Sequence, residues 1–128
     1  MAIRIVRLGT PRTPGEGLRI GTVRRPPRGV PKSEFASRDF YDAWLPELAP
    51  SEPLLKAGQS ASSDRQWQAF EKRYRAEMKQ PAASRLLDLI AALSQRTALS
   101  VGCYCENPSR CHRSVLKALL QERGARVG

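Results

Sequence analysis

The sequence predicts a small α/β domain in which a partly parallel sheet is flanked by helices. Three short apolar segments, bounded by Gly, Pro or polar loops, have the composition of strands. Three helical patterns lie between the second and third segments, and a last helix follows the third. Strands separated by helices favour a layered α/β arrangement, because parallel neighbours need crossover connections. At 128 residues the chain is long enough for one such domain, which we predict to span residues 1–128.

Two strands are predicted near the N-terminus. Residues 3–8 alternate loosely between apolar and polar side chains and end at Gly9. Residues 18–23 form a similar segment that stops before Pro26. Residues 9–17 hold three glycines and two prolines, so they are predicted to form a loop. Only three strands are visible in the whole chain, so the sheet is either small or has an edge strand that the pattern does not reveal.

A short helix is predicted between the second strand and the middle of the chain. Apolar side chains recur there at helix-like spacing, at Phe35, Phe40, Trp44 and Leu48. Pro46 interrupts the pattern, so the helix should end near Leu45. Residues 50–53 and 58–63 are predicted to be connectors because they are rich in Pro, Gly and Ser.

The clearest helix begins after Ser63. Ser63 and Gln66 form a capping box, and four large side chains follow on one stripe: Trp67, Phe70, Tyr74 and Met78. We attribute this aromatic stripe to core packing rather than to ligand binding. Pro81 fits the first turn of a further helix. The apolar face of that helix is formed by Leu86, Leu87, Ile90 and Leu93.

The third strand, residues 99–103, leads through a polar loop into the last helix, which Gly124 would cap. The core-facing side chains of that helix are Val115, Leu116, Leu119 and Leu120. The loop, residues 103–114, contains every cysteine and the only histidine of the chain. A loop between the C-terminal end of a strand and a helix N-terminus is a common site position, because free N–H groups and the helix dipole meet there. We therefore predict the functional site in this loop.

The same stretch resembles the C-terminal signature of the bacterial domain-of-unknown-function family numbered 488. In that signature a strand ends in Cys, seven residues including a Pro follow, and Cys-His-Arg begins a helix. The matching residues here are Cys103, Pro108 and residues 111–113. The resemblance supports the fold and the site position, but the family has no established activity that it could imply for this chain.

The resemblance to this family extends over nearly the whole chain. Residues 24–29 resemble its Arg-rich Pro-Arg-Gly turn, residues 44–51 its tryptophan-to-Pro-Ser segment, and residues 67–74 its aromatic helix. Residues 23–26 depart from the pattern, because they read Val-Arg-Arg-Pro where members often have Asp-Arg-Leu-Trp. No role of that Asp or Trp is therefore transferred to this chain.

The basic charge is concentrated near the N-terminus. The net charge is +10, and residues 1–30 contain seven arginines but one acidic residue, Glu16. Arginine among Pro and Gly suits bidentate contact with phosphate or carboxylate, so the predicted partners are a phosphate-bearing small molecule or nucleic acid. The alternative is a basic surface that only faces solvent.

The sequence shows no sign of a membrane partner. No apolar run approaches the ~20 residues that span a bilayer, and the first residues lack the apolar region of a signal peptide. Three cysteines, an odd number, argue against a secreted disulfide framework. We therefore predict a cytoplasmic protein.

The first functional hypothesis is binding of a phosphate-bearing or other anionic ligand. Basic and hydroxyl side chains gather at the start of the last helix, where free N–H groups are available. The Arg-rich turn supplies further donors suited to phosphate. The predicted anion-binding residues are Arg24, Arg28, Arg110, His112, Arg113 and Ser114. This hypothesis needs the fewest assumptions and is the predicted function.

The second hypothesis is a thiol-dependent enzyme. The spacing from Cys105 to Arg110 resembles the Cys-x4-Arg loop of rhodanese-type sulfurtransferases, where an arginine holds an anion beside a thiolate. Pro108 removes a backbone donor and Glu106 adds negative charge, so the resemblance is incomplete. A cysteine would be the nucleophile, the histidine a proton shuttle, and Arg110 or Arg113 the anion holder. The predicted catalytic residues are Cys105, Cys111 and His112.

A metal site is the third hypothesis. Three cysteines and a histidine are ligands that suit zinc. Structural zinc sites usually use two ligand pairs from separate turns, whereas this chain offers one cluster. Cys111 and His112 would also diverge if both lay on a helix. We therefore predict no metal, and no cofactor either, because the chain has no Gly-rich nucleotide-binding loop.

Two further interpretations remain open. A nucleic-acid-binding module would use the same basic surface, although the chain has no helix-turn-helix or zinc-finger pattern. In a purely structural interpretation, Cys103 and Cys111 are small buried hydrophobic residues and His112 supports the loop through hydrogen bonds.

Overall fold

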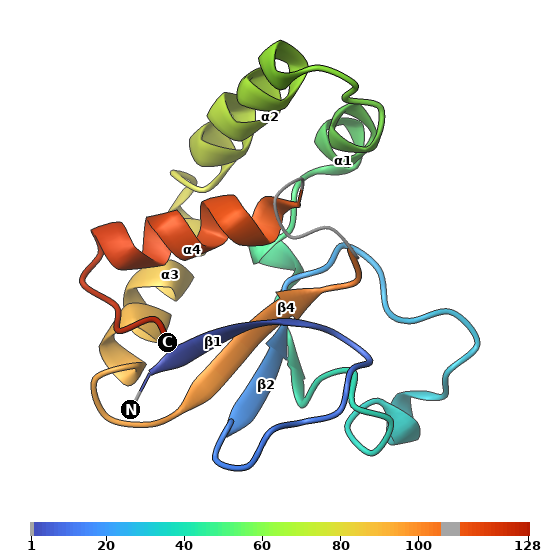
Figure 1. Ribbon diagram of the computed structural model, residues 1–128, viewed down its shortest axis with the longest axis vertical. Helices are drawn as coiled ribbons and strands as arrows, with labels where there is room; N and C mark the ends of the chain where they lie inside the picture. Colours follow the sequence, from blue (N-terminus) through green and yellow to red (C-terminus); the bar gives the residue numbers. More distant parts are fainter. Residues whose placement is uncertain (1, 106–110) are drawn as a thin grey trace.

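A parallel sheet of four strands organises the chain (Figure 1). The computed structural model describes residues 2–105 and 111–128. The strands are β1 (Ile3–Arg7), β2 (Leu18–Gly21), β3 (Ala43–Trp44) and β4 (Leu99–Cys103), in the spatial order β1-β4-β2-β3. The helices are α1 (Glu52–Gln59), α2 (Asp64–Glu77), α3 (Pro81–Leu93) and α4 (His112–Glu122). Every strand pair is parallel, so the predicted α/β class is confirmed.

Strand β4 is the centre of the sheet and is buried along its whole length. It pairs with β1 from Ile3 opposite Leu99, and with β2 from Leu18 opposite Leu99. The helices lie on one side of the sheet (Figure 1), where Ile3, Ile20 and Val101 join their apolar faces in the main core. The helix residues buried in that core include Leu54, Trp67, Phe70, Tyr74, Leu87, Ile90, Leu116 and Leu120.

The opposite face of the sheet is covered by irregular segments, residues 9–17 and 35–42. A parallel sheet needs cover on both faces, because both sides of its strands are apolar. Gly21 makes this cover possible, since a Cβ atom there would lie 2.4 Å from the ring of Tyr41. Tyr41 therefore packs directly on β2, in a second apolar cluster with Leu8 and Val23.

A buried ion pair joins these segments beneath the sheet. Arg19 is fully buried, and its Nε and Nη2 donate to Glu16 at 2.8 and 2.9 Å. Its Nη1 donates to the backbone oxygens of Thr10 and Asp39 at 2.8 and 2.7 Å. The hydroxyl of Ser100 also donates to Glu16 at 2.9 Å. Hydrogen bonds from Arg19 lower the pKa of Glu16 to about 2, so this carboxyl is ionised at neutral pH.

Most predicted elements are confirmed. The three strands, the helix after Ser63, the helix at Pro81 and the last helix are all present. The hydroxyl of Ser63 accepts a hydrogen bond from the Gln66 backbone at 3.2 Å, as expected for a helix cap. Gly124 follows α4 with a φ of +84°, the left-handed conformation of a C-terminal cap. None of the helices in the described ranges is long and apolar enough to cross a bilayer.

The predicted helix between residues 35 and 45 is wrong. The chain instead forms a 3-10 turn, Lys32–Glu34, and then the short edge strand β3, which the sequence pattern did not reveal. The spacing of Phe35 and Phe40 reflects packing into the second apolar cluster rather than one helix face. Trp44 is held by a hydrogen bond from its indole Nε1 to the Val23 carbonyl oxygen at 2.7 Å.

Helix α1 was missed, because Pro53 and Gly58 lie within its eight residues. Proline is tolerated there because it lies in the first turn, where its missing N–H has no helical partner. A Cβ atom on Gly58 would lie 2.7 Å from the ring of Phe70, so glycine allows α1 and α2 to pack closely. Leu54 anchors the helix in the main core.

The Arg19–Glu16 pair should make a large contribution to stability. We predict that Glu16→Gln lowers the free energy of unfolding by about 3 kcal/mol at pH 7, because it leaves a buried guanidinium without its counter-charge. The depressed pKa of Glu16 means that its contribution is present above about pH 4.5 and declines as the pH falls towards 2. Urea unfolding between about pH 7 and 3 should therefore show a steeper loss of stability in the wild-type protein than in Glu16→Gln.

Asp88→Asn provides the matched control for this comparison. Asp88 pairs with Arg123 at 2.9 Å, but its side chain is 67% exposed. Exposed pairs contribute less than about 1 kcal/mol, so this variant should unfold almost as the wild type does. Equal losses in the two variants would contradict the role assigned to the buried pair.

Candidate functional site

The C-terminal ends of β2 and β4 meet the start of α4 at one edge of the sheet. Cys103 is the last residue of β4, and His112 is the first residue of α4. Cys111 is the cap before α4 and has extended backbone angles, φ −135° and ψ 150°. Because Cys111 is not a helical residue, it does not diverge from His112. Its Sγ lies 3.8 Å from His112 Nδ1 and 2.7 Å from Cys103 Sγ.

His112 is buried and uncharged at neutral pH. Its Nε2 donates to the Thr22 carbonyl oxygen at 2.7 Å, so the proton lies on Nε2 and the lone pair on Nδ1. Burial lowers the pKa of His112 to about 4. The ring of Tyr74 packs edge-on against the imidazole, with ring centroids 5.6 Å apart. At pH 7 His112 therefore supplies an unprotonated nitrogen that faces Cys111 rather than a positive charge.

The thiols of Cys103 and Cys111 lie 2.7 Å apart, and Cys105 follows Cys103 at the inner pocket. Cys103 is 1% exposed, whereas Cys105 is only partly buried. Hydrogen bonds from Cys103 and Cys111 hold the pKa of Cys105 well below its usual range, and donating to Cys105 raises the pKa of Cys103. Of the three thiols, Cys105 therefore has the lowest pKa and loses its proton most readily.

Arg113 is buried beside the thiols, with 4% of its surface exposed. Its Nη2 donates to the Cys105 carbonyl oxygen at 2.6 Å, while its Nε has no hydrogen-bond partner in the described part of the chain. The structure gives it no carboxylate partner within residues 2–105 and 111–128. A buried guanidinium needs a compensating negative charge. Among the described residues the Cys105 thiol lies beside it and can provide this charge, and a bound anion is another source.

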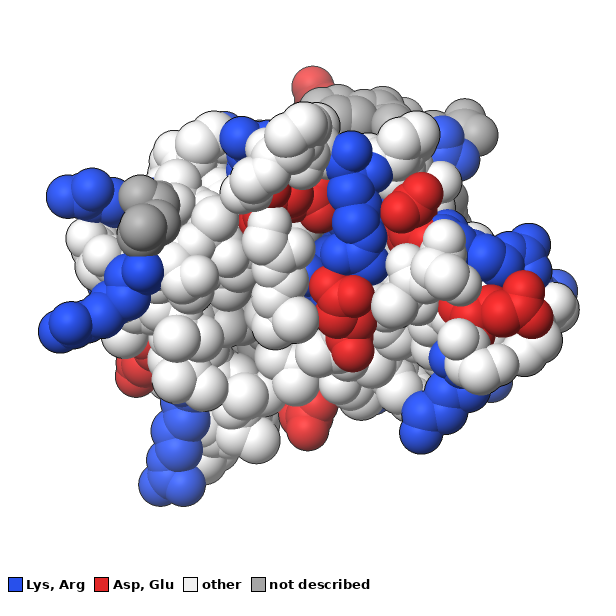
Figure 2. Space-filling model, turned by 90° about the horizontal axis from the view of Figure 1, so that it is seen from below, with Lys and Arg blue, Asp and Glu red and all other residues white. Residues whose placement is uncertain are grey.

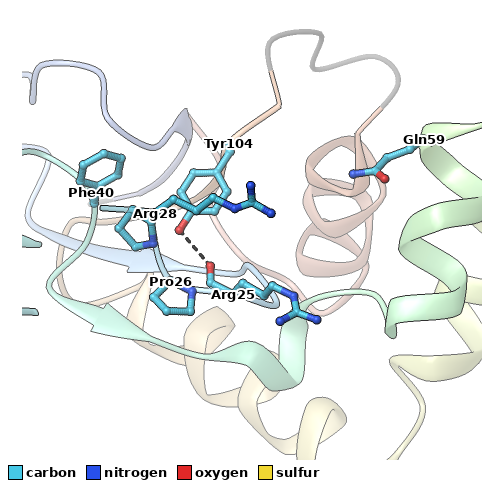
Figure 3. A pocket seen from close by; sticks show the side chains of 7 residues that line it. Arg25, Pro26, Arg28, Phe40, Gln59 and Tyr104 are labelled. Carbon is cyan, nitrogen blue, oxygen red and sulfur yellow. Dashed lines mark hydrogen bonds between the residues drawn. The ribbon is translucent and has the colours of Figure 1, made fainter. Parts of the chain in front are cut away.

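A surface cleft lies next to these residues, and its outer part is drawn in Figure 3. The outer cleft has a volume of about 1020 Å³ and is bordered by Arg28, Phe40 and Tyr104, with Gln59 of α1 on the other side. The inner pocket, about 170 Å³, shares Tyr104 and Gln59 with the outer cleft. It extends to Cys103, Cys105 and His112. A ligand in the outer cleft can therefore reach the thiols through the inner pocket.

Tyr104 fixes the Arg-rich turn next to the inner pocket. Its hydroxyl donates to the Arg25 carbonyl oxygen at 3.0 Å (Figure 3). The exposed Arg25 side chain pairs with Glu52 at the start of α1. Arg28 lies on the same side of the cleft and has no ion pair within the described residues. Arg28 therefore offers its guanidinium to a ligand at the mouth of the cleft.

The other predicted site residues have different surroundings. Arg24 lines the inner pocket, but its guanidinium donates to the carbonyl oxygens of Ala49 and Pro50 at 3.2 and 3.1 Å. The Ser114 hydroxyl donates back to the Cys111 carbonyl oxygen at 2.9 Å. Arg110 lies outside the described residues, as do Glu106 and Pro108, so the structure does not describe the rhodanese-like loop.

Sequence reasoning missed four residues that shape this site, namely Thr22, Phe40, Gln59 and Tyr104. Tyr104 lies between two candidate cysteines, which was a usable signal. Phe40 and Gln59 come from a loop and a helix far away in the chain, and nothing in the local sequence connects them with the cysteines.

Comparison with known proteins gives one match. The sequence model of a family described as the active DUF488-N3 subclade matches residues 3–124. This range includes all four strands, all four helices and the cysteine site. No curated protein and no solved structure matches the chain.

The lowered pKa of Cys105 predicts that this cysteine reacts faster than the other two. In reduced protein treated with a chelator, iodoacetamide should label Cys105 first at about pH 6.5, where a free thiol with a pKa of ~8.5 reacts slowly. Mass spectrometry of the digested protein would locate the label, and Cys105→Ser should lack the fast phase. Slow labelling of all three thiols would contradict a Cys105 thiolate.

Proposed function

The chain belongs to the DUF488 family, and we propose that it binds a phosphate-bearing or otherwise anionic ligand in the cleft next to the Cys103–Ser114 segment. The observation that carries this proposal is the buried Arg113, whose Nε lacks a partner in the described part of the chain. Arg113 lies behind Cys105, which lines the inner pocket, so an anion bound in that pocket would balance its charge. The nearby start of α4 adds the partial positive charge of a helix N-terminus.

The cleft has a size and lining suited to a small molecule. Its outer part, about 1020 Å³, is as large as the pockets that enclose small ligands. Arg28 can bind a negative group there through paired N–H donors. Phe40 and Tyr104, with ring centroids 6.4 Å apart, offer apolar contact to the rest of the ligand. We therefore propose an anion that also carries an apolar or planar part.

A nucleic-acid partner is a less favoured proposal. On the described part of the face drawn in Figure 2, Lys and Arg side chains are separated by acidic and uncharged ones. Of the cations near the site, Arg113 is buried and Arg24 is occupied by backbone carbonyls. A cleft with Arg28 at its mouth fits a small anion better than a long polyanion, which needs many phosphate contacts.

A thiol-dependent enzyme is the second candidate function. The partly buried Cys105 lines the inner pocket, where a bound ligand can reach it, and Arg113 lies beside it. A thiolate in this position is a competent nucleophile. His112 could exchange a proton only through Nδ1, because its Nε2 donates to the Thr22 carbonyl oxygen. The description of the matching subclade as active agrees with this candidate.

Anion binding can be tested with pyrophosphate as the probe. We expect isothermal titration calorimetry to show binding that weakens about tenfold in Arg28→Ala, because a charge-assisted hydrogen bond contributes about 1.5–3 kcal/mol. Arg96→Ala is the matched control, because Arg96 is an exposed arginine just before β4, at the opposite edge of the sheet from the cleft. This control should bind like the wild type.

The alternatives give different results in the same assay. If both arginine variants lose affinity equally, the interaction is with general surface charge and the cleft proposal is wrong. Nucleic acid would be favoured if RNA or DNA oligonucleotides bound more tightly than pyrophosphate at ~50 mM salt, with steep weakening as salt increased. Covalent modification of Cys105 by a ligand, visible by mass spectrometry, would favour the thiol-dependent enzyme.

A further inference from the structure

We propose that this protein binds one zinc ion, or another divalent cation that prefers sulfur, next to the inner pocket. The proposed ligands, called here the cysteine–histidine cluster, are Cys103, Cys105, Cys111 and His112. This inference goes beyond anion binding and does not depend on it. It rests on the distances among Cys103, Cys111 and His112, on the hydrogen bond that orients the imidazole and on the buried charge next to the cluster.

Three ligand atoms already converge on one point. Cys103 Sγ, Cys111 Sγ and a ring nitrogen of His112 lie within 4.8 Å of one another, and all three residues are buried. Zinc–sulfur bonds of about 2.3 Å in a tetrahedron imply a sulfur–sulfur separation of roughly 3.8 Å. The two sulfurs are now 2.7 Å apart, so a rotation of one side chain would open the space for an ion. Sulfur and imidazole nitrogen are the ligands that structural zinc prefers.

The imidazole is oriented as in zinc sites. Histidines that bind zinc usually donate their other ring N–H to a backbone carbonyl or a carboxylate, which fixes the ring and its tautomer. Here Nε2 donates to the Thr22 carbonyl oxygen, and Nδ1 points its lone pair towards Cys111. The Thr22 backbone is itself fixed, because its N–H donates to the Gly102 carbonyl oxygen at 2.9 Å. The sheet thus holds His112 ready to bind through Nδ1.

Cys105 is the fourth ligand of the proposed site. It lies two residues after Cys103 and lines the inner pocket together with Cys103 and His112, so rotation of its side chain would bring its sulfur to the ion. Because Cys105 is partly exposed to the inner pocket, it also provides the path by which an ion can enter. Zinc binding would replace the remaining thiol protons, which pass to solvent.

The charge of the loaded site agrees with its surroundings. Three thiolates and one zinc ion carry a net charge of −1, because neutral His112 adds none. Arg113 lies beside Cys105 with no carboxylate partner in the described residues. The guanidinium and the α4 N-terminus would therefore compensate this charge in a buried environment.

Reduced, chelator-treated protein provides a direct test with Zn²⁺ or Co²⁺ alone as the probe. We expect about one equivalent of zinc per chain by elemental analysis after desalting. Co²⁺ should give the strong visible bands of tetrahedral cobalt together with sulfur-to-metal charge-transfer bands. Loading with Zn²⁺ should also slow the alkylation of Cys105. This effect can be measured in the wild-type protein without any substitution.

Two substitutions complete the test. Cys111→Ser should lose the metal and the charge-transfer bands, whereas Ser37→Ala, at an exposed position away from the site, should keep both. Wild-type protein with three reduced thiols that binds neither ion would overturn the proposal. Equal metal retention by Cys111→Ser and the wild type would also overturn it, because the bound ion would then be adventitious. If Cys111→Ser does not fold, the cobalt spectrum of the wild-type protein and the protection of its Cys105 from alkylation still show whether the site binds metal.

Discussion

The buried pair of Arg19 and Glu16 is the constraint on which the rest of the structure depends. The helices shield only one face of the sheet, so the other face must be closed by chain without regular structure. Such segments lack the regular backbone hydrogen bonds of strands and helices. Arg19 holds them instead by donating to the backbone oxygens of Thr10 and Asp39. Glu16 then neutralises the guanidinium and accepts from Ser100 on the central strand. One charged cluster thus holds two loops against the sheet.

The Arg19–Glu16 pair also affects the position of the site's residues, because it holds the segment of residues 35–42 in place. Asp39, held by Arg19, lies next to Phe40 and Tyr41. Tyr41 packs on Gly21, and Phe40 borders the outer cleft. The wall of the cleft therefore depends on an ion pair that has no contact with a ligand.

The sequence predicted the elements whose local pattern agrees with their final environment. Strand β4 was predictable because all five residues are buried, so its run is apolar or small throughout. Strand β3 has only two residues, too few for any alternation to be visible. The spacing of Phe35 and Phe40 imitated a helix, but tertiary contacts in the second cluster produce it. Secondary structure is therefore mispredicted from local spacing where contacts with distant parts of the chain determine which positions carry apolar side chains.

The arrangement around the candidate site followed from the sequence only in outline. The concentration of cysteines and His112 between a strand and a helix predicted that they lie together, and the structure places Cys103, Cys111 and His112 at one edge of the sheet. The geometry depended on one backbone conformation: extended angles at Cys111 bring its sulfur towards His112, where a helical residue would turn it away. The cleft was not predictable, because its walls come from three distant parts of the chain.

The inner end of this cleft is built on the central strand, whereas its mouth is built largely from irregular segments around Arg28 and Phe40. Changes at the mouth can therefore alter which molecule is admitted while the thiols and the imidazole stay in place, so that one chemical centre could serve different ligands as this lineage diverges.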